Sequence, residues 1–311
     1  MTTAGIILAI AVLFYFLGKS ADIIVINVRK IAGHFGVPVF FLGLILGFLT
    51  SLPEFSIGIN SLVRNATEIS FGNLIGGLFV LFGLILGISA FVNRGIKTDG
   101  KFSSAIPFAL CAISPVLLGF DGRISQLDGI ALIILYFFVI YHAKTTAENS
   151  IDSPKAAVSK KGMVKIFFAV MAGIILLIIF STAIMNFTLL LFNGLNVSKM
   201  LIGVVVFSLG TNLPEVAVTV RAWKKHAQEL SMSNIIGSAL ANIFIIGVLA
   251  FMRPFRIETN ASYIAIAAFL AAILALFVYF YETNRKFSRK EGFVLFSFYA
   301  FFIIAQISLF A

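Results

Sequence analysis

Charged residues are scarce in this sequence of 311 residues. Asp, Glu, Lys and Arg together make up 12% of it, whereas soluble domains usually carry about a quarter of charged residues. The mean hydropathy is +1.07 and 60% of the residues are apolar. Such a chain has far more apolar surface than one soluble core can bury, so the composition excludes a soluble domain and indicates an integral membrane protein.

Cysteine and histidine are nearly absent. The single cysteine, Cys111, has no partner for a disulfide within the chain and lies in an apolar run, where it serves as core packing. The three histidines, His34, His142 and His226, fall near the ends of apolar segments and far from any acid inside such a segment. A zinc enzyme needs histidines at helical spacing. These absences disfavour an intramembrane protease, and we predict that the chain is not an enzyme.

The first apolar run does not have the pattern of a cleavable leader. The first apolar run, residues 6–16, has no basic stretch before it and no small-residue cleavage pattern after it, so we expect a retained helix. A membrane span needs about 20 apolar residues. The spans that meet this length lie at about 4–27, 37–62, 70–92, 102–119, 126–143, 163–190, 198–222, 231–252, 258–281 and 290–310. The sequence therefore predicts an all-α membrane protein with ten transmembrane helices.

The excess of basic residues, which gives a net charge of +10, follows the predicted topology. Of the 23 Lys and Arg residues, 18 lie in or beside the connections after helices 1, 3, 5, 7 and 9. The other five are Arg64, Arg123, Lys199, Arg253 and Arg256. By the positive-inside rule, the odd connections are cytoplasmic and both termini are extracytoplasmic. We therefore expect a multi-pass protein of the plasma membrane, and no nucleic-acid partner.

One motif occurs twice. Residues 49–54 are LTSLPE and residues 210–215 are GTNLPE, followed by NLIG at 73–76 and NIIG at 234–237. Corresponding positions are 161 residues apart throughout, which indicates a duplication.

The duplication divides the chain into two halves. We expect a first five-helix repeat over 1–144, a cytoplasmic linker over 145–162 and a second five-helix repeat over 163–311. Because each half has an odd number of helices, the two copies cross the membrane in opposite senses. Inverted repeats are typical of secondary transporters that work by alternating access.

Only two acidic residues, Glu54 and Glu215, lie deep within the predicted spans. An ionised side chain at the bilayer centre costs at least about 2.5 to 3.5 kcal/mol, so each needs compensation. Neither repeat core contains a Lys or Arg that could supply it. A bound cation is the simplest compensation, and two carboxylates balance one divalent ion.

Oxygen ligands surround both glutamates in the sequence. Each glutamate follows a proline, Pro53 or Pro214. Proline cannot donate the helical hydrogen bond and so frees the carbonyls of Leu49 and Gly210. Calcium takes six to eight oxygens from carboxylates, carbonyls and waters. The candidate metal ligands are therefore Glu54, Glu215, Thr50, Thr211, Ser51, Asn212, Ser238 and Asn242. The alternative for each hydroxyl is a hydrogen bond back to its own helix.

The paired motifs, with GNLIGG at 72–77 and SNIIGS at 233–238, resemble the two alpha-repeats of the sodium/calcium exchanger family, within the calcium:cation antiporters. The resemblance covers essentially the whole chain. It implies four cation sites in a diamond between helices 2, 3, 7 and 8, with helices 1 and 6 sliding as a gating unit. It also implies ligand roles for Glu54, Glu215, Thr50, Thr211, Ser51 and Ser238.

Several positions depart from the family pattern. Asn212 and Gly77 stand where the family has serine, and Leu49 and Ser233 where glycine is usual. Where the family has Asn or Asp on helices 3 and 8, this chain has Leu81, whose side chain cannot bind a cation, and Asn242, which cannot carry negative charge. The site then has two formal negative charges, which match one divalent ion but leave three sodium ions with excess charge in a medium of low dielectric. The counter-ion is therefore open between sodium and protons, which the glutamates themselves could carry.

From these observations we predict a secondary active antiporter that exchanges Ca2+ for Na+. The alternatives are a Ca2+/H+ exchanger, or another exchanger of divalent cations for protons, and a transport-impaired relative or passive channel. We expect no tightly bound cofactor, since Ca2+ and Na+ or H+ are the transported ions. The expected partners are inorganic cations and the lipid bilayer, with the chain acting as a monomer.

Overall fold

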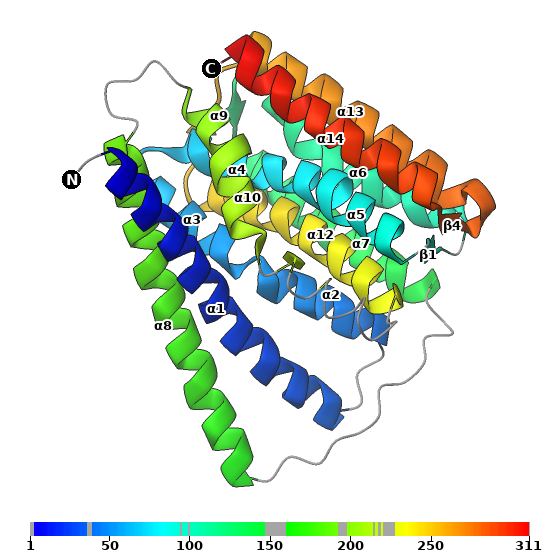
Figure 1. The fold of residues 1–311 in the computed structure, drawn as a ribbon, viewed down its shortest axis with the longest axis horizontal. Coiled ribbons are helices and arrows are strands. Elements are labelled where there is room, and N and C mark those ends of the chain that lie inside the picture. Colours follow the sequence, from blue (N-terminus) through cyan, green and yellow to red (C-terminus); the bar gives the residue numbers. More distant parts are fainter. Residues whose placement is uncertain are drawn as a thin grey trace.

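The structure is a computed structural model that describes residues 3–35, 39–93, 95–98, 100–146, 160–191, 198–213, 215–216, 219 and 228–310. Nearly all of these residues are helical (Figure 1). The first half contains the α-helices α1 (Thr3–Phe35), α2 (Val39–Thr50), α3 (Leu52–Val63), α4 (Thr67–Phe79), α5 (Leu86–Val92), α6 (Phe102–Leu118) and α7 (Gln126–Thr146). A π-helix, η1 (Val80–Ile85), joins α4 to α5 without a break, and a 3-10 turn, η2 (Gly119–Asp121), follows α6.

The second half contains the α-helices α8 (Lys160–Leu191), α9 (Lys199–Ile202), α10 (Ser208–Thr211), α12 (Gln228–Met252), α13 (Ala261–Glu282) and α14 (Arg289–Phe310). A π-helix, η3 (Gly203–Phe207), lies between α9 and α10, and a 3-10 turn, η4 (Thr283–Arg285), follows α13. Nine segments of the described residues are long and apolar enough to cross a membrane, and a shorter apolar segment runs over Lys199–Thr211. The prediction of an all-α membrane fold is confirmed. Much of the span expected at 198–222 lies outside the described residues.

Most predicted element ends lie within about three residues of the observed ones, and two differences affect the predicted connections. α1 continues to Phe35, beyond the end expected at residue 27, so Arg29 and Lys30 lie on the helix and not in a connection. In the predicted linker, residues 145–146 belong to α7 and residues 160–162 to α8, while residues 147–159 lie outside the described residues. Helices that project beyond the apolar span add polar turns which a hydropathy pattern assigns to the connections.

Two short antiparallel sheets tie the halves together. β1 (Ile96–Lys97) pairs with β4 (Lys286–Phe287), and β2 (Arg123–Ile124) pairs with β3 (Phe255–Arg256). Adding the offset of 161 to β1 gives residues 257–258, next to β3, and adding it to β2 gives 284–285, next to β4. Each sheet therefore joins one strand of the first half to the non-equivalent strand of the second. This exchange is what an internal two-fold axis between the predicted inverted halves would produce.

The centre of the molecule is formed by the continuous helix from α4 to α5 and by α12, which are the most buried of the apolar spans. Their apolar side chains form one core with residues of α6, α13 and α14. α1 and α8 lie side by side along one edge and pack mainly against each other (Figure 1). Many side chains on the outer helices are apolar and exposed, as a lipid-facing surface requires.

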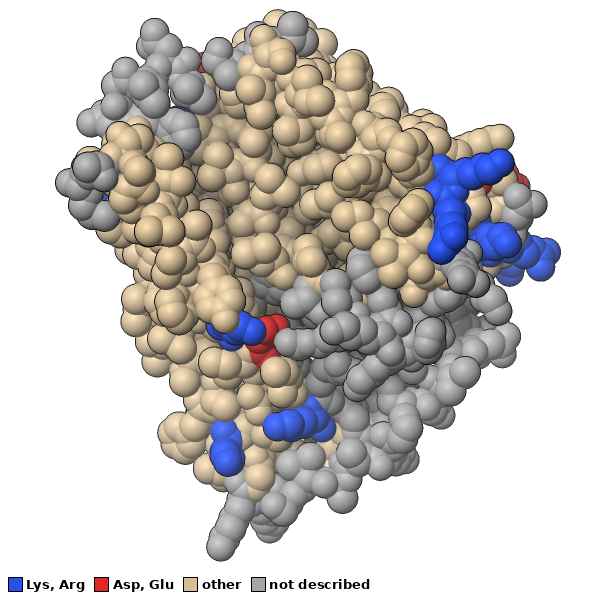
Figure 2. All heavy atoms as spheres, viewed as in Figure 1, with Lys and Arg blue, Asp and Glu red and all other residues tan. Residues whose placement is uncertain are grey.

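Basic side chains of the described residues gather in parts of the face drawn in Figure 2. They are visible near the C-terminal half of α1, near the start of α8 and beside β4, while the broad tan area above them in this view is uncharged. The beginning of α1 and the end of α14 lie together at the opposite end of the bundle in Figure 1. A wide uncharged zone with charge gathered at its borders suits a protein embedded in a bilayer.

Candidate cation site

Both predicted glutamates lie just beyond a break in a helix. Between α2 and α3, Ser51 has φ −84° and ψ 8°. After α10, the equivalent residue Asn212 has φ −80° and ψ 9°. Pro53 accounts for the first break because it has no amide hydrogen to donate; Pro214 lies outside the described residues. The two halves thus interrupt their helices at matching positions and with matching backbone geometry.

The carboxylates of Glu54 and Glu215 are completely buried, with 0% of either residue exposed. They are close enough to repel each other electrostatically. Among the described residues, neither oxygen of Glu54 has a hydrogen-bond partner, and the same holds for Oε2 of Glu215. The ion pairs found in the described part of the chain, Lys19 with Asp22 and Arg123 with Asp121, involve neither glutamate. Two buried and repelling acids therefore need positive charge from protons or from a cation.

A cluster of oxygens lies beside Glu215. The hydroxyls of Thr50 and Ser51 donate to the Gly47 carbonyl one turn earlier, each at 3.0 Å, which is the bond back to their own helix that the sequence offered as the alternative. The Ser238 hydroxyl, from the other half, lies 3.1 Å from the same carbonyl. The Ser238 Oγ is also 3.2 Å from Thr50 Oγ1 and 3.3 Å from Glu215 Oε1. These contacts bring together five oxygens, which are the Gly47 carbonyl, the three hydroxyls and Oε1 of Glu215. The three hydroxyl protons cannot occupy all the lone pairs of these five oxygens. This oxygen cluster, drawn from both halves, can coordinate a hard cation.

The second threonine lies on the side of Glu54. Thr211 Oγ1 is 3.1 Å from Oδ1 of Asn73 and 3.0 Å from the Phe207 carbonyl. The Thr211 hydroxyl also lies near the Glu54 carboxylate, without a hydrogen bond between them. Each predicted threonine thus approaches the glutamate of the other half, since Thr50 and Ser51 interact with Glu215. The binding region is therefore shared between the halves.

The two predicted asparagines use their amide nitrogens in hydrogen bonds to the backbone. Asn212 Nδ2 donates to the Ser208 carbonyl at 2.8 Å, and Asn242 Nδ2 donates to the Leu74 carbonyl at 3.0 Å. Oδ1 of Asn242 has no partner among the described residues. The structure thus places all eight predicted ligands in one buried region.

Leu81 contributes no polar atom to this region. It is fully buried in the apolar core and lies within η1. The π-helix has no counterpart at the equivalent residues 241–246, which are α-helical in α12. The two halves therefore differ in both side chain and backbone at the level of Asn242.

Sequence reasoning missed three participants. The Gly47 carbonyl accepts from the predicted hydroxyls, whereas the sequence drew attention only to Leu49 and Gly210. Asn73 and Asn234 are fully buried, and among the described residues Asn73 Nδ2 and both side-chain polar atoms of Asn234 have no partner. Both asparagines belong to the duplicated NLIG and NIIG motifs, so the constant offset was a signal that could have identified them. Buried amides without partners indicate a site that interacts with something besides the protein.

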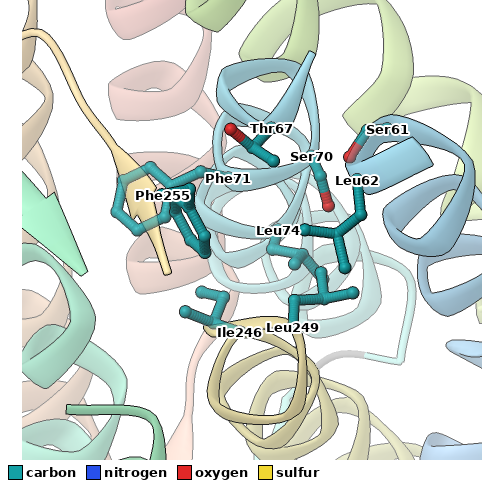
Figure 3. Close-up of a pocket in the computed structure, with 9 residues that line it drawn as sticks. All are labelled: Ser61, Leu62, Thr67, Ser70, Phe71, Leu74, Ile246, Leu249 and Phe255. Atoms are coloured by element: carbon teal, nitrogen blue, oxygen red, sulfur yellow. The ribbon is translucent and has the colours of Figure 1, made fainter. Parts of the chain in front are cut away.

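A second pocket lies between α3, α4 and α12 and is shown in Figure 3. Its lining includes the hydroxyls of Ser61, Thr67 and Ser70 beside leucine, isoleucine and phenylalanine side chains. It leaves no room for a water-sized sphere, and none of the predicted ligands lines it. This pocket is therefore not part of the candidate cation site.

Comparisons with known proteins match this chain to sodium/calcium exchangers over nearly its whole length. The family profile described as sodium/calcium exchanger protein matches residues 5–144 and 165–308. The sodium/calcium exchanger MaX1 of Methanosarcina acetivorans is 26% identical over 336 residues, covering 93% of this chain and 95% of that protein. The solved structure of the sodium-calcium exchanger NCX_Mj soaked with Na+ and Sr2+ superimposes with a TM-score of 0.69 at 25% identity, covering 98% of each chain.

A second solved structure has the same fold. The H+/Ca2+ exchanger CAX superimposes with a TM-score of 0.77 over 97% of this chain and 87% of that one, at 17% identity. At this identity the likeness concerns the fold alone. The arrangement of helices is therefore common to exchangers with different counter-ions.

Proposed function

Because this chain belongs to the sodium/calcium exchanger family, we propose that it carries Ca2+ across the membrane in exchange for Na+ through the region around Glu54 and Glu215. Family membership makes the chain a membrane-embedded antiporter of inorganic cations. The specific proposal is that both glutamates ligate the ions and that Thr50, Thr211, Ser51 and Ser238 supply further oxygens. No catalysed reaction and no tightly bound cofactor enters this function.

One observation carries the proposal: two fully buried carboxylates, one from each half, lie within electrostatic reach of each other, and three of their four oxygens are unpartnered among the described residues. A calcium ion bound between them neutralises both charges. The neighbouring hydroxyls and the Gly47 carbonyl add the neutral oxygens that calcium prefers. Sodium ions are also hard cations and can use the same oxygens once calcium has left.

The shared construction of the site supports alternating access. Ser238 on α12 contacts both the Gly47 carbonyl on α2 and Glu215, so its neighbours belong to both halves. The Ser56 hydroxyl on α3 is 2.6 Å from that of Ser181 on α8, which links the long α1 and α8 pair to the helix that follows the first break. We take α1 and α8 as the gating unit, since a movement of this pair can open one side of the site.

The orientation follows from the basic residues. We propose a plasma-membrane protein with both termini extracytoplasmic and with the polar segment between α7 and α8 in the cytoplasm. The two inverted halves proposed for 1–144 and 163–311 enclose one cation pathway, so a monomer is sufficient for exchange.

Protons are the second candidate counter-ion. The unpartnered oxygens of Glu54 and Glu215 can each accept a proton, which would neutralise the site as calcium does. In that mode, the site needs no monovalent metal position at all. The oxygen cluster beside Glu215 favours sodium, because a proton would not need five converging oxygens.

The test is calcium uptake by proteoliposomes containing the purified chain. With the membrane potential clamped, we expect 45Ca2+ uptake when Na+ is concentrated inside the vesicles and no uptake when only a pH gradient is imposed. Uptake with the pH gradient alone would replace sodium by protons. Calcium–calcium counterflow gives the control for a transport-impaired relative, since an exchanger shows trans-stimulation and a passive channel does not.

A further inference from the structure

The offset of 161 aligns the two sides of the site residue by residue, and the two sides differ. The aligned pairs are Gly47 with Ser208, Ser51 with Asn212, and Gly77 with Ser238. On the side of the first helix break, the aligned positions present the Gly47 carbonyl and the hydroxyls of Ser51 and Ser238. The two hydroxyl oxygens keep lone pairs for an ion, and the Gly47 carbonyl can join them once the hydroxyls rotate away from it.

On the side of the second break, an amide group takes the place of a hydroxyl. Asn212 Nδ2 donates to the Ser208 carbonyl at 2.8 Å. A carbonyl can only accept, so the nitrogen of this amide must face it, and an amide NH2 group has no lone pair for a cation. The Ser208 carbonyl is therefore covered by a donor of the site itself, as the Gly47 carbonyl is by the Ser51 hydroxyl, but here the donor is a nitrogen that cannot ligate a cation.

The remaining ligand position on this side is also filled by NH2 groups. A Cβ atom at Gly77 would lie 2.6 Å from Asn242 Nδ2 and 3.3 Å from Asn212 Nδ2. The Leu74 carbonyl fixes the nitrogen of Asn242, just as the Ser208 carbonyl fixes the nitrogen of Asn212. Where the first side has the Ser238 oxygen, the second side has two amide nitrogens and no side chain of its own.

We infer that this exchanger has one monovalent-cation position beside a helix break, not two. This position is formed by Gly47, Thr50, Ser51, Ser238 and Glu215. The equivalent position beside Glu54 binds no cation, because the NH2 groups of Asn212 and Asn242 occupy it. The inference rests on the proposed function and specifies its stoichiometry. With one sodium ion in this cluster and one between the carboxylates, two sodium ions balance the two carboxylates, as one calcium ion does. Exchange of two Na+ for one Ca2+ then moves no net charge.

Sodium activation of calcium uptake tests the inference in proteoliposomes. We expect a Hill coefficient for Na+ of no more than about two, because a third sodium ion would leave excess charge in the buried site. Uptake should also be unchanged when a potassium and valinomycin potential is imposed. A Hill coefficient near three, or uptake that follows the potential, would overturn the inference.

Variants at aligned positions separate the two sides. Ser51→Ala removes an oxygen of the proposed position and is expected to raise the half-saturating Na+ concentration by about tenfold, the effect of ~1.4 kcal/mol. Ser114→Ala is the matched control, since that hydroxyl only donates to the Cys111 carbonyl of its own helix. If Asn212→Ala raised the half-saturating Na+ concentration as much as Ser51→Ala, Asn212 would be a ligand and the inference would be overturned.

A double variant should allow a sodium ion to bind at the position beside Glu54. Gly77→Ser with Asn212→Ser supplies two hydroxyls where NH2 groups now lie, and we expect uptake to become dependent on the potential. If the folded double variant exchanged calcium without dependence on the potential, the claim that the amide groups keep sodium out of this position would be wrong. Na+-dependent thermal shifts of the purified variants give an independent measurement. If no variant moves calcium while Ser51→Ala alone weakens the Na+ shift, the proposed function fails and the inference stands.

Discussion

Calcium binding is expected to be lost when either buried glutamate is replaced by glutamine. Glu54→Gln and Glu215→Gln keep the side-chain volume but remove one of the two charges that neutralise a divalent ion. Breaking a buried charge pair costs about 3 to 5 kcal/mol, which corresponds to roughly a hundredfold or more in affinity. Isothermal titration with Ca2+ and 45Ca2+ uptake in proteoliposomes measure the effect. We expect both variants to show no saturable uptake.

The same variants should not be less stable in the absence of calcium. Replacing one of the two buried carboxylates removes their electrostatic repulsion in the calcium-free protein. We therefore expect the melting temperature of each variant in detergent to stay constant or rise. The stabilisation that wild type gains from calcium should disappear. Glu282→Gln, at the exposed C-terminal end of α13, is the control and should keep both calcium binding and uptake. Calcium binding retained in both buried variants would remove the central claim of the proposed function.

The position of the site could be predicted because the duplication is preserved in the sequence. Two prolines and two glutamates at a constant offset implied matching helix breaks, and the observed backbone angles at Ser51 and Asn212 agree within a few degrees. An acid within an apolar span implies a buried charge regardless of how the helices pack. These inferences need only local sequence and the thickness of the bilayer. For this reason they reached the fold class and the burial of the candidate ligands, while the role of each ligand in binding stays a prediction.

The chemistry of each ligand could not be predicted in the same way. An asparagine offers an oxygen or a nitrogen, and only the Ser208 and Leu74 carbonyls decide which atom of Asn212 and Asn242 they face. The Gly47 carbonyl joins the site because Ser238 approaches from the other half, a contact 191 residues apart in sequence. Such contacts depend on how the inverted halves dock. A hydropathy pattern holds no information about docking, nor about the π-helix that shifts the register beyond Gly77.

Close approach of α2 and α12 is what brings these oxygens together, and Gly47 makes it possible. A Cβ at this position would lie 2.6 Å from the Asn234 carbonyl oxygen and 2.6 Å from the carbonyl carbon of Gly237. Its nearest neighbour would be the Ser238 amide nitrogen. These are backbone atoms of a long helix, which cannot rotate away as the end of a side chain can. Small residues at a helix contact are a common device for close packing within a bilayer.

Gly47→Ala is therefore expected to force α2 away from α12 and to separate the Gly47 carbonyl from Ser238. Overpacking of this kind costs about 1 to 3 kcal/mol, and the loss of converging oxygens should weaken Na+ and Ca2+ binding by roughly tenfold or more. Gly18→Ala in α1 is the matched control, because its added Cβ would meet only Leu213 Cβ, at 3.7 Å. The measurements are the melting temperatures of the two variants and their affinities for Na+ and Ca2+ by titration. Equal ion affinities in Gly47→Ala and Gly18→Ala would mean that binding does not depend on the contact between α2 and α12.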